Sequence, residues 1–208
     1  MTLYFSPLSC SLAARIVLTE ASLPATFVEV CRFTKRVLPA DEDYYAIHPL
    51  GVVPVLLTED GDVISENVAV LQYLAERTGQ MPATMGERAQ LASWFGFIAT
   101  ELHKGTFYPF FDTESDDGAR AYALRKAPHR FSVLERRLGD RETVLGGAFS
   151  VADAYLVTVL TWARATPIDL SPYEHISAYL ERHLKRPSVA ASRAAEMPLF
   201  VAQNERVG

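Results

Sequence analysis

The chain has 208 residues, of which 49% are hydrophobic and 22% are charged, and its formal charge is −5. This is the composition of an ordinary globular protein with enough apolar residues for a core, so we expect little disorder. A nucleic-acid binder needs a concentrated basic surface, whereas this chain is acidic and has no Lys/Arg-rich block. We therefore expect no nucleic-acid partner.

The arrangement of the apolar residues, the cysteines and the histidines limits where in the cell the protein is expected and which cofactors it is expected to bind. No stretch approaches the roughly 18 consecutive apolar residues of a membrane span, and the opening MTLYFSPLSC does not have the pattern of a secretory signal. Cys10 and Cys31, the only cysteines, fit neither a metal site nor a disulfide framework. The five histidines include no HxxxH or HExxH pair. We expect a cytoplasmic protein without membrane contact and without a metal.

The first third of the sequence alternates between strand and helix patterns. Strand patterns lie at residues 2–5, 26–30, 54–58 and 63–65, and helical patterns lie at residues 11–21 and 67–77. The Asp60-Gly61 pair between the last two strands is a strong hairpin signal. The strand–helix–strand order predicts that the first two strands are parallel with a right-handed crossover. The sequence therefore predicts a small α/β sheet domain that closes near residue 77.

After residue 77 the pattern is helical to the end. Residues 78–87, which begin with TGQMPATMG, are rich in helix breakers and predict a linker. Two apolar stripes at helical spacing follow, the second one interrupted by Pro128: Leu91, Phe95, Ile98 and Leu102, then Leu124, Phe131, Leu134 and Leu138. Residues 150–153 (SVAD) form a capping box with Asp in place of Glu. The helix behind this box is apolar nearly all round, which predicts a central buried helix.

Cys10 is the first candidate for chemistry. It follows a predicted helix cap, Ser9, at the N-terminal turn after a strand. A thiol there is close to the positive end of the helix dipole and to unpaired amide hydrogens, which favour the thiolate. An inert buried cysteine fits the same pattern equally well. No CxxC is present, so a dithiol redox cycle is disfavoured.

Two other segments lie where ligands can meet free backbone groups. Val53-Pro54 precedes a predicted strand, and with a cis bond the Val53 backbone would pair with an extended peptide. The alternative is that Pro54 is an ordinary proline of an edge strand, without a role in binding. Ser65, Glu66 and Asn67 open a helix, where amides can bind a carboxylate and Glu66 can attract an ammonium group. The alternative is that Ser65 simply caps the helix, and this interpretation is compatible with a ligand site.

The remaining candidates are Thr100, His103, Lys104 and Lys35. Thr100 and His103 fall on one face of a predicted helix, next to Lys104. For the His103-Lys104 pair alone we favour an ordinary helix end at Gly105, with cations at the negative end of the dipole. Lys35 is a solvated loop charge unless an anion lies nearby.

In their order and spacing, these segments resemble the cytosolic glutathione transferases, most closely the bacterial beta class, over essentially the whole chain. The matching segments are Leu3…Pro7…Cys10-Ser11-Leu12-Ala13, Pro49…Gly51…Val53-Pro54, Ser65-Glu66, residues 98–104 (IATELHK) and residues 149–155 (FSVADAY). The resemblance implies a thioredoxin-like α/β domain (1–77), a linker (78–87) and an all-α helical-bundle domain (88–208). It also implies a homodimer with one glutathione site per subunit.

The same resemblance assigns roles to the candidates. The implied glutathione-binding residues are Cys10, Lys35, Val53, Glu66, Asn67, Thr100, His103 and Lys104. Cys10 would lie beside the glutathione sulfur, and Val53 would pair with the cysteinyl backbone. Glu66 and Asn67 would hold the γ-glutamyl end, and Lys35 would neutralise a carboxylate. His103 and Lys104 would line the cleft near the thiol, with Thr100 close by, and Cys10 and His103 would be the catalytic residues.

We expect a detoxification enzyme that transfers glutathione, its co-substrate, to small hydrophobic electrophiles, and no metal takes part. The helix N-terminus, a donor from Cys10 or Ser11, and His103 would stabilise the glutathione thiolate. The electrophile site would be lined by Phe107, Tyr108 and Phe110.

Two alternatives remain open. Cys10 would support a glutathione-dependent thiol–disulfide oxidoreductase or peroxidase through a mixed disulfide. A non-catalytic glutathione-binding module is the other alternative, because the chain departs from the family pattern at three positions. Phe5 stands where the family often has Tyr, and Gly96 and His48 stand where Asn is common.

Overall fold

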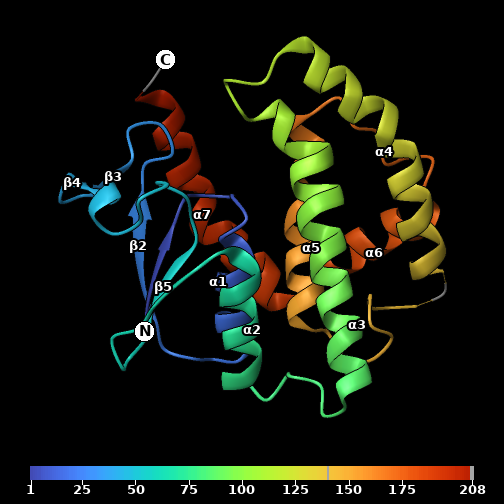
Figure 1. Cartoon of the computed structure of the whole chain (residues 1–208), viewed down its shortest axis with the longest axis horizontal. Coiled ribbons are helices and arrows are strands. Elements are labelled where there is room, and N and C mark those ends of the chain that lie inside the picture. Colours follow the sequence, from blue (N-terminus) through green and yellow to red (C-terminus); the bar gives the residue numbers. More distant parts are fainter. Residues whose placement is uncertain (140, 207–208) are drawn as a thin grey trace. The chain divides into compact units, whose positions relative to one another are not determined.

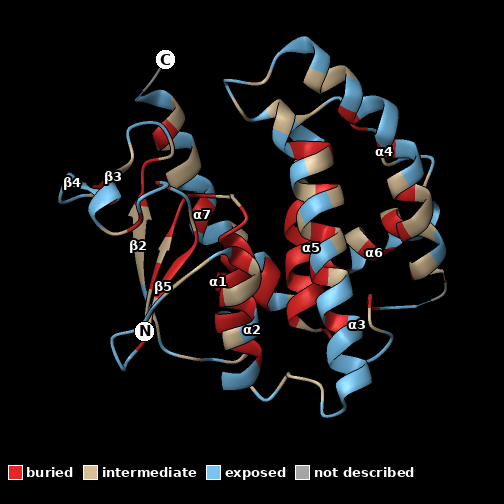
Figure 2. Cartoon of the chain, in the orientation of Figure 1, coloured by how far each residue is buried: buried red, intermediate tan, exposed pale blue. Residues whose placement is uncertain are grey.

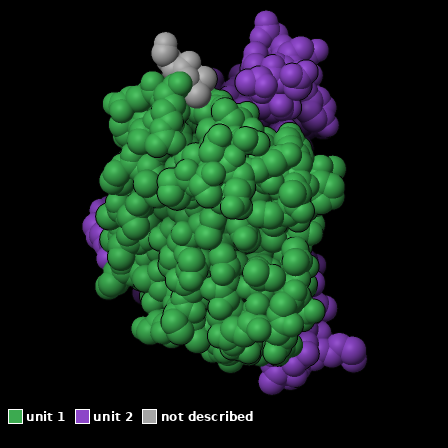
Figure 3. All heavy atoms as spheres, turned by 90° about the vertical axis from the view of Figure 1, so that its left-hand side faces the viewer, with its two compact units in different colours: residues 1–81, 186–208 green, residues 82–185 purple. Residues whose placement is uncertain are grey.

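The computed structural model of the chain describes residues 1–139 and 141–206, and Figure 1 shows the elements in chain order. The chain divides into two compact units, Met1–Met81 with Arg186–Gly208, and Pro82–Lys185 (Figure 3). This division differs from the expected domains, 1–77 and 88–208, because the last helix packs on the first helix of unit 1.

Unit 1 contains a six-stranded mixed sheet of order β4-β3-β2-β1-β5-β6. Its strands are β1 (Thr2–Phe5), β2 (Thr26–Val30), β3 (Arg36–Leu38), β4 (Glu42–Asp43), β5 (Val55–Leu57) and β6 (Val63–Ser65). The predicted parallel pairing of β1 with β2 and the predicted hairpin of β5 with β6 are confirmed. The sequence does not predict β3 and β4, because two or three residues are too few to show a period of two.

The helices of unit 1 are α1 (Leu12–Glu20), α2 (Asn67–Arg77) and α7 (Pro187–Glu205). Helix α1 contacts both α2 and α7, and its residues 12–18 are all buried (Figure 2). These buried residues include Arg15. The cation must therefore find its partners inside the protein, because an isolated buried charge is costly.

Adjacent residues of β1 point to opposite faces of the sheet, as its period of two requires. Tyr4 packs against Tyr44, in an apolar cluster whose buried members are Val30, Val37, Tyr44 and Val55. Phe5 packs instead against Phe27 and under the Arg15 guanidinium. Tyr4 therefore does not replace the phenol that is missing at position 5.

Unit 2 is built from helices. They are α3 (Met85–Gly96), a π-helical segment (Phe97–Phe107), two short 3₁₀ turns (Tyr108–Phe110 and Trp162–Ala165), α4 (Asp117–Leu138), α5 (Val151–Thr161) and α6 (Glu174–Leu184). The prediction that the helix after residue 150 is central is confirmed, because residues 151–160 are all buried (Figure 2). The first apolar stripe is also buried throughout.

Three details of unit 2 differ from the sequence prediction. Helix α3 begins at Met85, because Thr84 and Glu87 form a capping box, so the linker is shorter than residues 78–87. Helix α4 continues through Pro128. The prediction of the second apolar stripe is wrong at Leu124, because this residue is 41% exposed. Within the described ranges, no helix is both long and apolar enough to cross a membrane.

One buried carboxylate holds the start of α5. Asp153 Oδ2 accepts hydrogen bonds from the Ser150 N–H (2.9 Å) and the Ser150 hydroxyl (2.6 Å). Asp153 Oδ1 accepts from the Val144 N–H (2.7 Å) and the Tyr179 hydroxyl (2.8 Å). The predicted capping box is therefore confirmed, and the same side chain also ties α5 to α6 and to the preceding loop.

We expect Asp153→Ala to lower the free energy of unfolding by about 3–5 kcal/mol, because it leaves several buried donors without an acceptor. Tyr179→Phe removes only one donor and should cost about 1 kcal/mol. Urea denaturation of both variants beside the wild type measures the two costs. Equal costs would contradict the central place of the carboxylate.

Candidate functional site

Cys10 lies in the loop between β1 and α1. Its side chain is 9% exposed, and its Sγ donates a hydrogen bond to the Val53 carbonyl (3.3 Å). The Leu12 N–H bonds the Ser9 carbonyl and the Ala13 N–H bonds the Cys10 carbonyl, so the chain is already coiled when it reaches the thiol. Cys10 therefore lies where the sequence places it, in the turn that leads from a strand into a helix.

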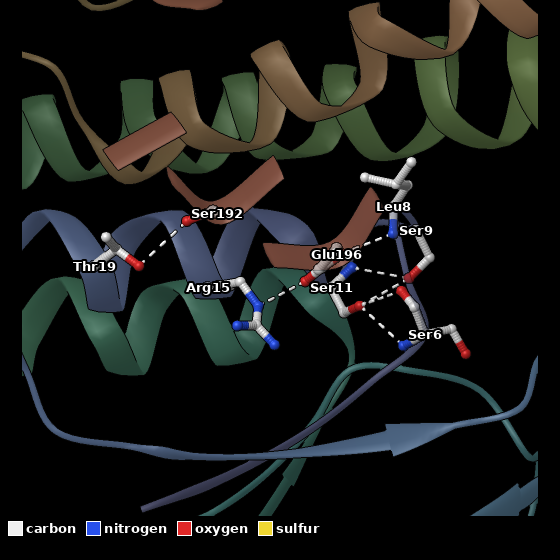
Figure 4. Close-up of polar contacts among 8 residues, drawn as sticks. All are labelled: Ser6, Leu8, Ser9, Ser11, Arg15, Thr19, Ser192 and Glu196. Carbon is white, nitrogen blue, oxygen red and sulfur yellow. Dashed lines mark hydrogen bonds and ion pairs between the residues drawn. The ribbon is translucent and has the colours of Figure 1, made fainter. Parts of the chain in front are cut away.

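Three serines hold this loop together (Figure 4). The fully buried Ser11 hydroxyl lies 3.2 Å from the Ser6 carbonyl and 2.8 Å from the Ser9 hydroxyl. Ser9 Oγ accepts the Ser11 N–H (3.3 Å). The predicted cap of the helix by Ser9 is wrong, because the N-cap of α1 is Ser11, which makes no side-chain cap bond. The expectation that Ser11 donates to a thiolate gains no support, because its hydroxyl is enclosed by its neighbours in the loop.

The turn before β5 carries the partner of the thiol. The Val53-Pro54 bond is cis, as one of the two sequence-based interpretations requires. Val53 accepts the thiol hydrogen bond through its carbonyl, and its N–H has no hydrogen-bond partner among residues 1–139 and 141–206. The buried Tyr44 donates its hydroxyl proton to the Val52 carbonyl (3.0 Å). A ligand that reaches Cys10 would therefore also find an available amide.

The N-terminus of α2 holds Glu66 and Asn67. Glu66 adopts a φ of +69° at the N-cap and makes no side-chain cap bond. Asn67 is 7% exposed, and neither of its side-chain amide atoms has a partner among the residues that the structure describes. A buried amide without a partner is costly, so a ligand that satisfies it would bind well. The expected cap by Ser65 is wrong, because Glu66 occupies the N-cap.

Lys35 lies in the loop between β2 and β3 and is partly buried. Its N–H bonds the Cys31 carbonyl and its carbonyl accepts the Tyr44 N–H, both at 3.0 Å. Burial lowers the pKa of the Lys35 ammonium, and the nearby Cys31 thiol opposes that shift. An anionic ligand would restore the stability of the charged form.

His103 lies in the π-helical segment of unit 2. Its Nδ1 is 2.8 Å from the Tyr155 hydroxyl, and its ring packs edge to face with Trp162 at 4.9 Å between centroids. Burial, and then the charge of Lys104, lowers the pKa of His103 to about 4. The imidazole is therefore neutral near pH 7, and it can exchange a hydrogen bond with a ligand but brings no positive charge.

Thr100 and Lys104 make local contacts. The exposed Thr100 donates its hydroxyl proton to the Gly96 carbonyl (3.0 Å). Lys104 Nζ lies 3.8 Å from the ring centroid of Tyr108, at cation–π distance. Neither contact involves a buried unsatisfied group, so the local geometry of these two residues does not itself point to a ligand.

The predicted helix end at Gly105 is wrong, because the π-helical segment continues to Phe107. A Cβ at Gly105 would lie 2.7 Å from the Thr100 carbonyl oxygen and 2.8 Å from Arg130 Nη2. The Arg130 guanidinium donates to the Gly105 carbonyl (2.7 Å) and to Glu101 Oε2 (2.8 Å). Gly105 is thus required by close packing rather than by a helix terminus.

The aromatic residues expected around an electrophile differ in burial. Phe107 is fully buried against Phe131 and Trp162, so its expected place on a pocket wall is wrong. Tyr108 is 39% exposed and Phe110 is partly buried. Sequence reasoning missed Trp162 and Tyr155, the two aromatic neighbours of His103, although both lie on or directly after the predicted central helix.

Unit 1 therefore brings Cys10 and Val53 into contact and holds Lys35, Glu66 and Asn67. The other candidates, Thr100, His103 and Lys104, share one helical segment of unit 2. Among the described residues, no group of three or more His, Cys, Asp or Glu side chains has the arrangement of a metal site.

Two family models match the chain. The N-terminal domain of glutathione S-transferases matches residues 9–77, and the C-terminal domain of glutathione S-transferases matches residues 97–187. The chain therefore belongs to the glutathione S-transferase family. The predicted family, its transferase class, and the fold of a thioredoxin-like domain with a helical domain are confirmed.

Individual relatives lead to the same class. Glutathione S-transferase GstA of Escherichia coli O157:H7 is 38% identical over 200 residues, which cover 94% of this chain and 98% of GstA. A bacterial beta class glutathione S-transferase from Sphingomonas chungbukensis has a TM-score of 0.87 at 36% identity. A sphingomonad glutathione S-transferase in complex with glutathione has a TM-score of 0.87 at 35% identity. Each structure is matched over 94% of this chain and 98% of its own.

We expect His103 to make the stability of the protein depend on pH. Its folded-state pKa of about 4 lies below the ordinary 6.5, so its contribution is complete above pH 6.5 and is lost as the pH falls toward 4. From neutral pH to near pH 4.5, the wild type should lose about 2 kcal/mol more than His103→Gln. Urea unfolding at both pH values measures this difference, and equal losses would refute the buried neutral ring.

Proposed function

We propose that the protein is an active glutathione transferase, which adds the glutathione thiolate to small hydrophobic electrophiles. The observation that carries this proposal is the bond of Cys10 Sγ to the carbonyl of Val53, beside a cis-proline. A tripeptide that pairs with the Val53 amide by strand addition would bring its own cysteine close to Cys10. The complex of a sphingomonad relative with glutathione supports the choice of ligand.

The remaining groups of unit 1 suit the charged ends of glutathione. The N-terminus of α2 offers amides to the γ-glutamyl carboxylate. Asn67 would satisfy its buried amide on the same group, and the exposed Glu66 carboxylate would attract the ammonium group. Lys35 would neutralise a carboxylate of the ligand.

Catalysis requires the bound thiol to become a thiolate. A shift of its pKa from about 8.5 to near 6.5 corresponds to about 3 kcal/mol. We assign this stabilisation to the N-terminus of α1 and to a hydrogen bond from the Cys10 thiol, both in unit 1. The role of His103 in unit 2 is what the family resemblance implies, and as a neutral ring it would give at most a hydrogen bond. Tyr108 and Phe110 remain candidates for contact with an apolar electrophile.

We propose further that the protein is a cytoplasmic homodimer. Cys10 and Cys31 form no disulfide within the described residues, which fits a reducing compartment, and the beta-class relationship favours a dimer. Light scattering would then give twice the chain mass of 23.1 kDa. A mass of one chain would refute the dimer, and recovery of the protein outside the cytoplasm on cell fractionation would refute the location.

We expect Cys10→Ala to lower kcat/KM for a chloronitrobenzene substrate roughly threefold to tenfold, because loss of one hydrogen bond to the thiolate costs about 0.5–1.5 kcal/mol. Steady-state kinetics with saturating glutathione tests this. Unchanged kinetics would remove Cys10 from the reaction.

Intact-mass measurement after exposure to oxidised glutathione tests the alternative through Cys10. A gain of one glutathione on Cys10, with no conjugating activity, would replace transfer by thiol–disulfide exchange. Glutathione binding without turnover of electrophiles or hydroperoxides would identify a binding module.

We expect Asn67→Ala to weaken glutathione binding about fivefold to tenfold, as for a lost hydrogen bond of about 1 kcal/mol. The free protein should not be destabilised, because the substitution removes a buried amide without a partner. Calorimetric titration and thermal unfolding measure the two effects. A parallel loss of stability and affinity would show that Asn67 is only structural.

A further inference from the structure

Glu196 of α7 contacts the loop that carries Cys10, although 188 residues separate it from that loop. Its Oε2 accepts the N–H of Leu8 at 2.7 Å, two residues before the cysteine. Its Oε1 accepts the Nε–H of Arg15 at 2.7 Å, on the second turn of α1 (Figure 4). Leu8 and Arg15 lie on either side of Cys10 in the sequence, so one carboxylate clamps both ends of the segment that holds the thiol.

The loop needs such a clamp. Leu8 has a φ of +58°, in the left-handed region that non-glycine residues rarely adopt. Leu8 lies within a turn that the Ser9 N–H closes on the Ser6 carbonyl (3.2 Å). The residue before it is Pro7, which has no N–H, so the Leu8 amide is the donor that the middle of this turn offers. A strained conformation persists only where surrounding contacts impose it, and the bond to Glu196 is such a contact.

The partner cation is itself held in place. The guanidinium carbon of Arg15 lies 3.7 Å from the ring centroid of Phe27 and 4.5 Å from that of Phe5. Both stacking distances are within the cation–π range. Arg15 is therefore fixed by α1 and the sheet, and it presents Nε to the carboxylate in a set direction.

A gain in folding stability does not account for the ion pair of Glu196 with Arg15. Glu196 is fully buried, and burial raises its pKa to about 7 against the favourable effects of the Leu8 amide and Arg15, while Glu29 of β2 adds repulsion. Burial also lowers the pKa of Arg15. The cost of desolvating a buried ion pair often cancels its attraction, so such pairs are better explained by the geometry that they impose.

We propose that Glu196 is a positioning residue for Cys10, which sets the place of the thiol at the N-terminus of α1 through Leu8 and Arg15. This inference rests on the proposed function only for its consequence in catalysis, since the position of the thiol can be measured without any substrate. Glu196 lies outside the segments that the two family models match, 9–77 and 97–187.

The same pair of helices supplies a matched control. The buried Ser192 donates its hydroxyl to Thr19 Oγ1 (3.2 Å), again between α7 and α1 (Figure 4). That contact is at the far end of α1 from Cys10 and does not include the loop. Ser192→Ala therefore perturbs the packing of α7 on α1 without touching the clamp.

The test uses three variants of the full chain. Glu196→Gln keeps the shape and removes the charge, Glu196→Asp keeps the charge and shortens the reach, and Ser192→Ala is the control. The rate of Cys10 alkylation by iodoacetamide is followed against pH by peptide mass spectrometry, which separates Cys10 from Cys31. Thermal unfolding shows that each variant is folded, and kcat/KM for transfer is measured beside it.

We expect both Glu196 variants to raise the midpoint of the alkylation curve by at least about half a pH unit, because the thiol moves away from the positive end of the α1 dipole, which favours its thiolate. Transfer should fall about threefold, no more than in Cys10→Ala, and Ser192→Ala should stay within about twofold of the wild type in alkylation and in transfer. A shift in Glu196→Gln alone would show a charge effect and overturn the proposal, as would unchanged alkylation in both. If the wild type transfers no glutathione, the proposed function fails, and the alkylation curves still decide the role of Glu196.

Discussion

Burial of residues 12–18 of α1 is the constraint on which unit 1 depends. Because residues 12–18 are buried, the polar groups at the start of the helix must be satisfied by the protein rather than by water. Ser6, Ser9 and Ser11 satisfy one another, and Glu196 satisfies Leu8 and Arg15. The thiol of Cys10 lies in the middle of this network. A reactive group is thus presented by a loop with little freedom to relax.

Both units use a buried carboxylate from a helix to organise an adjacent loop. Asp153 holds residues on its own helix, on α6 and on the preceding loop, and Glu196 joins its helix to a loop and to α1. The two sites differ in their donors. The donors to Asp153 among the described residues are neutral, whereas Glu196 also faces a cation. The environment of Glu196 therefore combines a strong contact with a large desolvation cost.

The sequence predicts the elements that have clear periodicity and the turns that have strong signals. The parallel pair, the hairpin at Asp60-Gly61 and the SVAD capping box follow from local rules. The continuation of the helix past Gly105 does not, because the contact of Arg130 with the Gly105 carbonyl joins residues 25 positions apart and leaves no local signal.

For the site, local patterns place Cys10 and the cis-proline turn correctly. They also select Asn67, whose unsatisfied amide only the three-dimensional structure reveals. They miss Glu196, because nothing in residues 187–205 marks one glutamate among several polar residues as buried. A contact across 188 residues leaves no periodic or spacing signal in the sequence.

The placement of α7 in unit 1 has a consequence for biosynthesis. Since α7 follows unit 2 in the sequence, a nascent polypeptide that has emerged only as far as residue 185 still lacks the carboxylate beside Leu8. The loop between β1 and α1 is therefore completed by a helix that is synthesised after the whole of unit 2. Such non-local closure is slow relative to local helix formation, so Cys10 becomes fully ordered only once α7 has been synthesised.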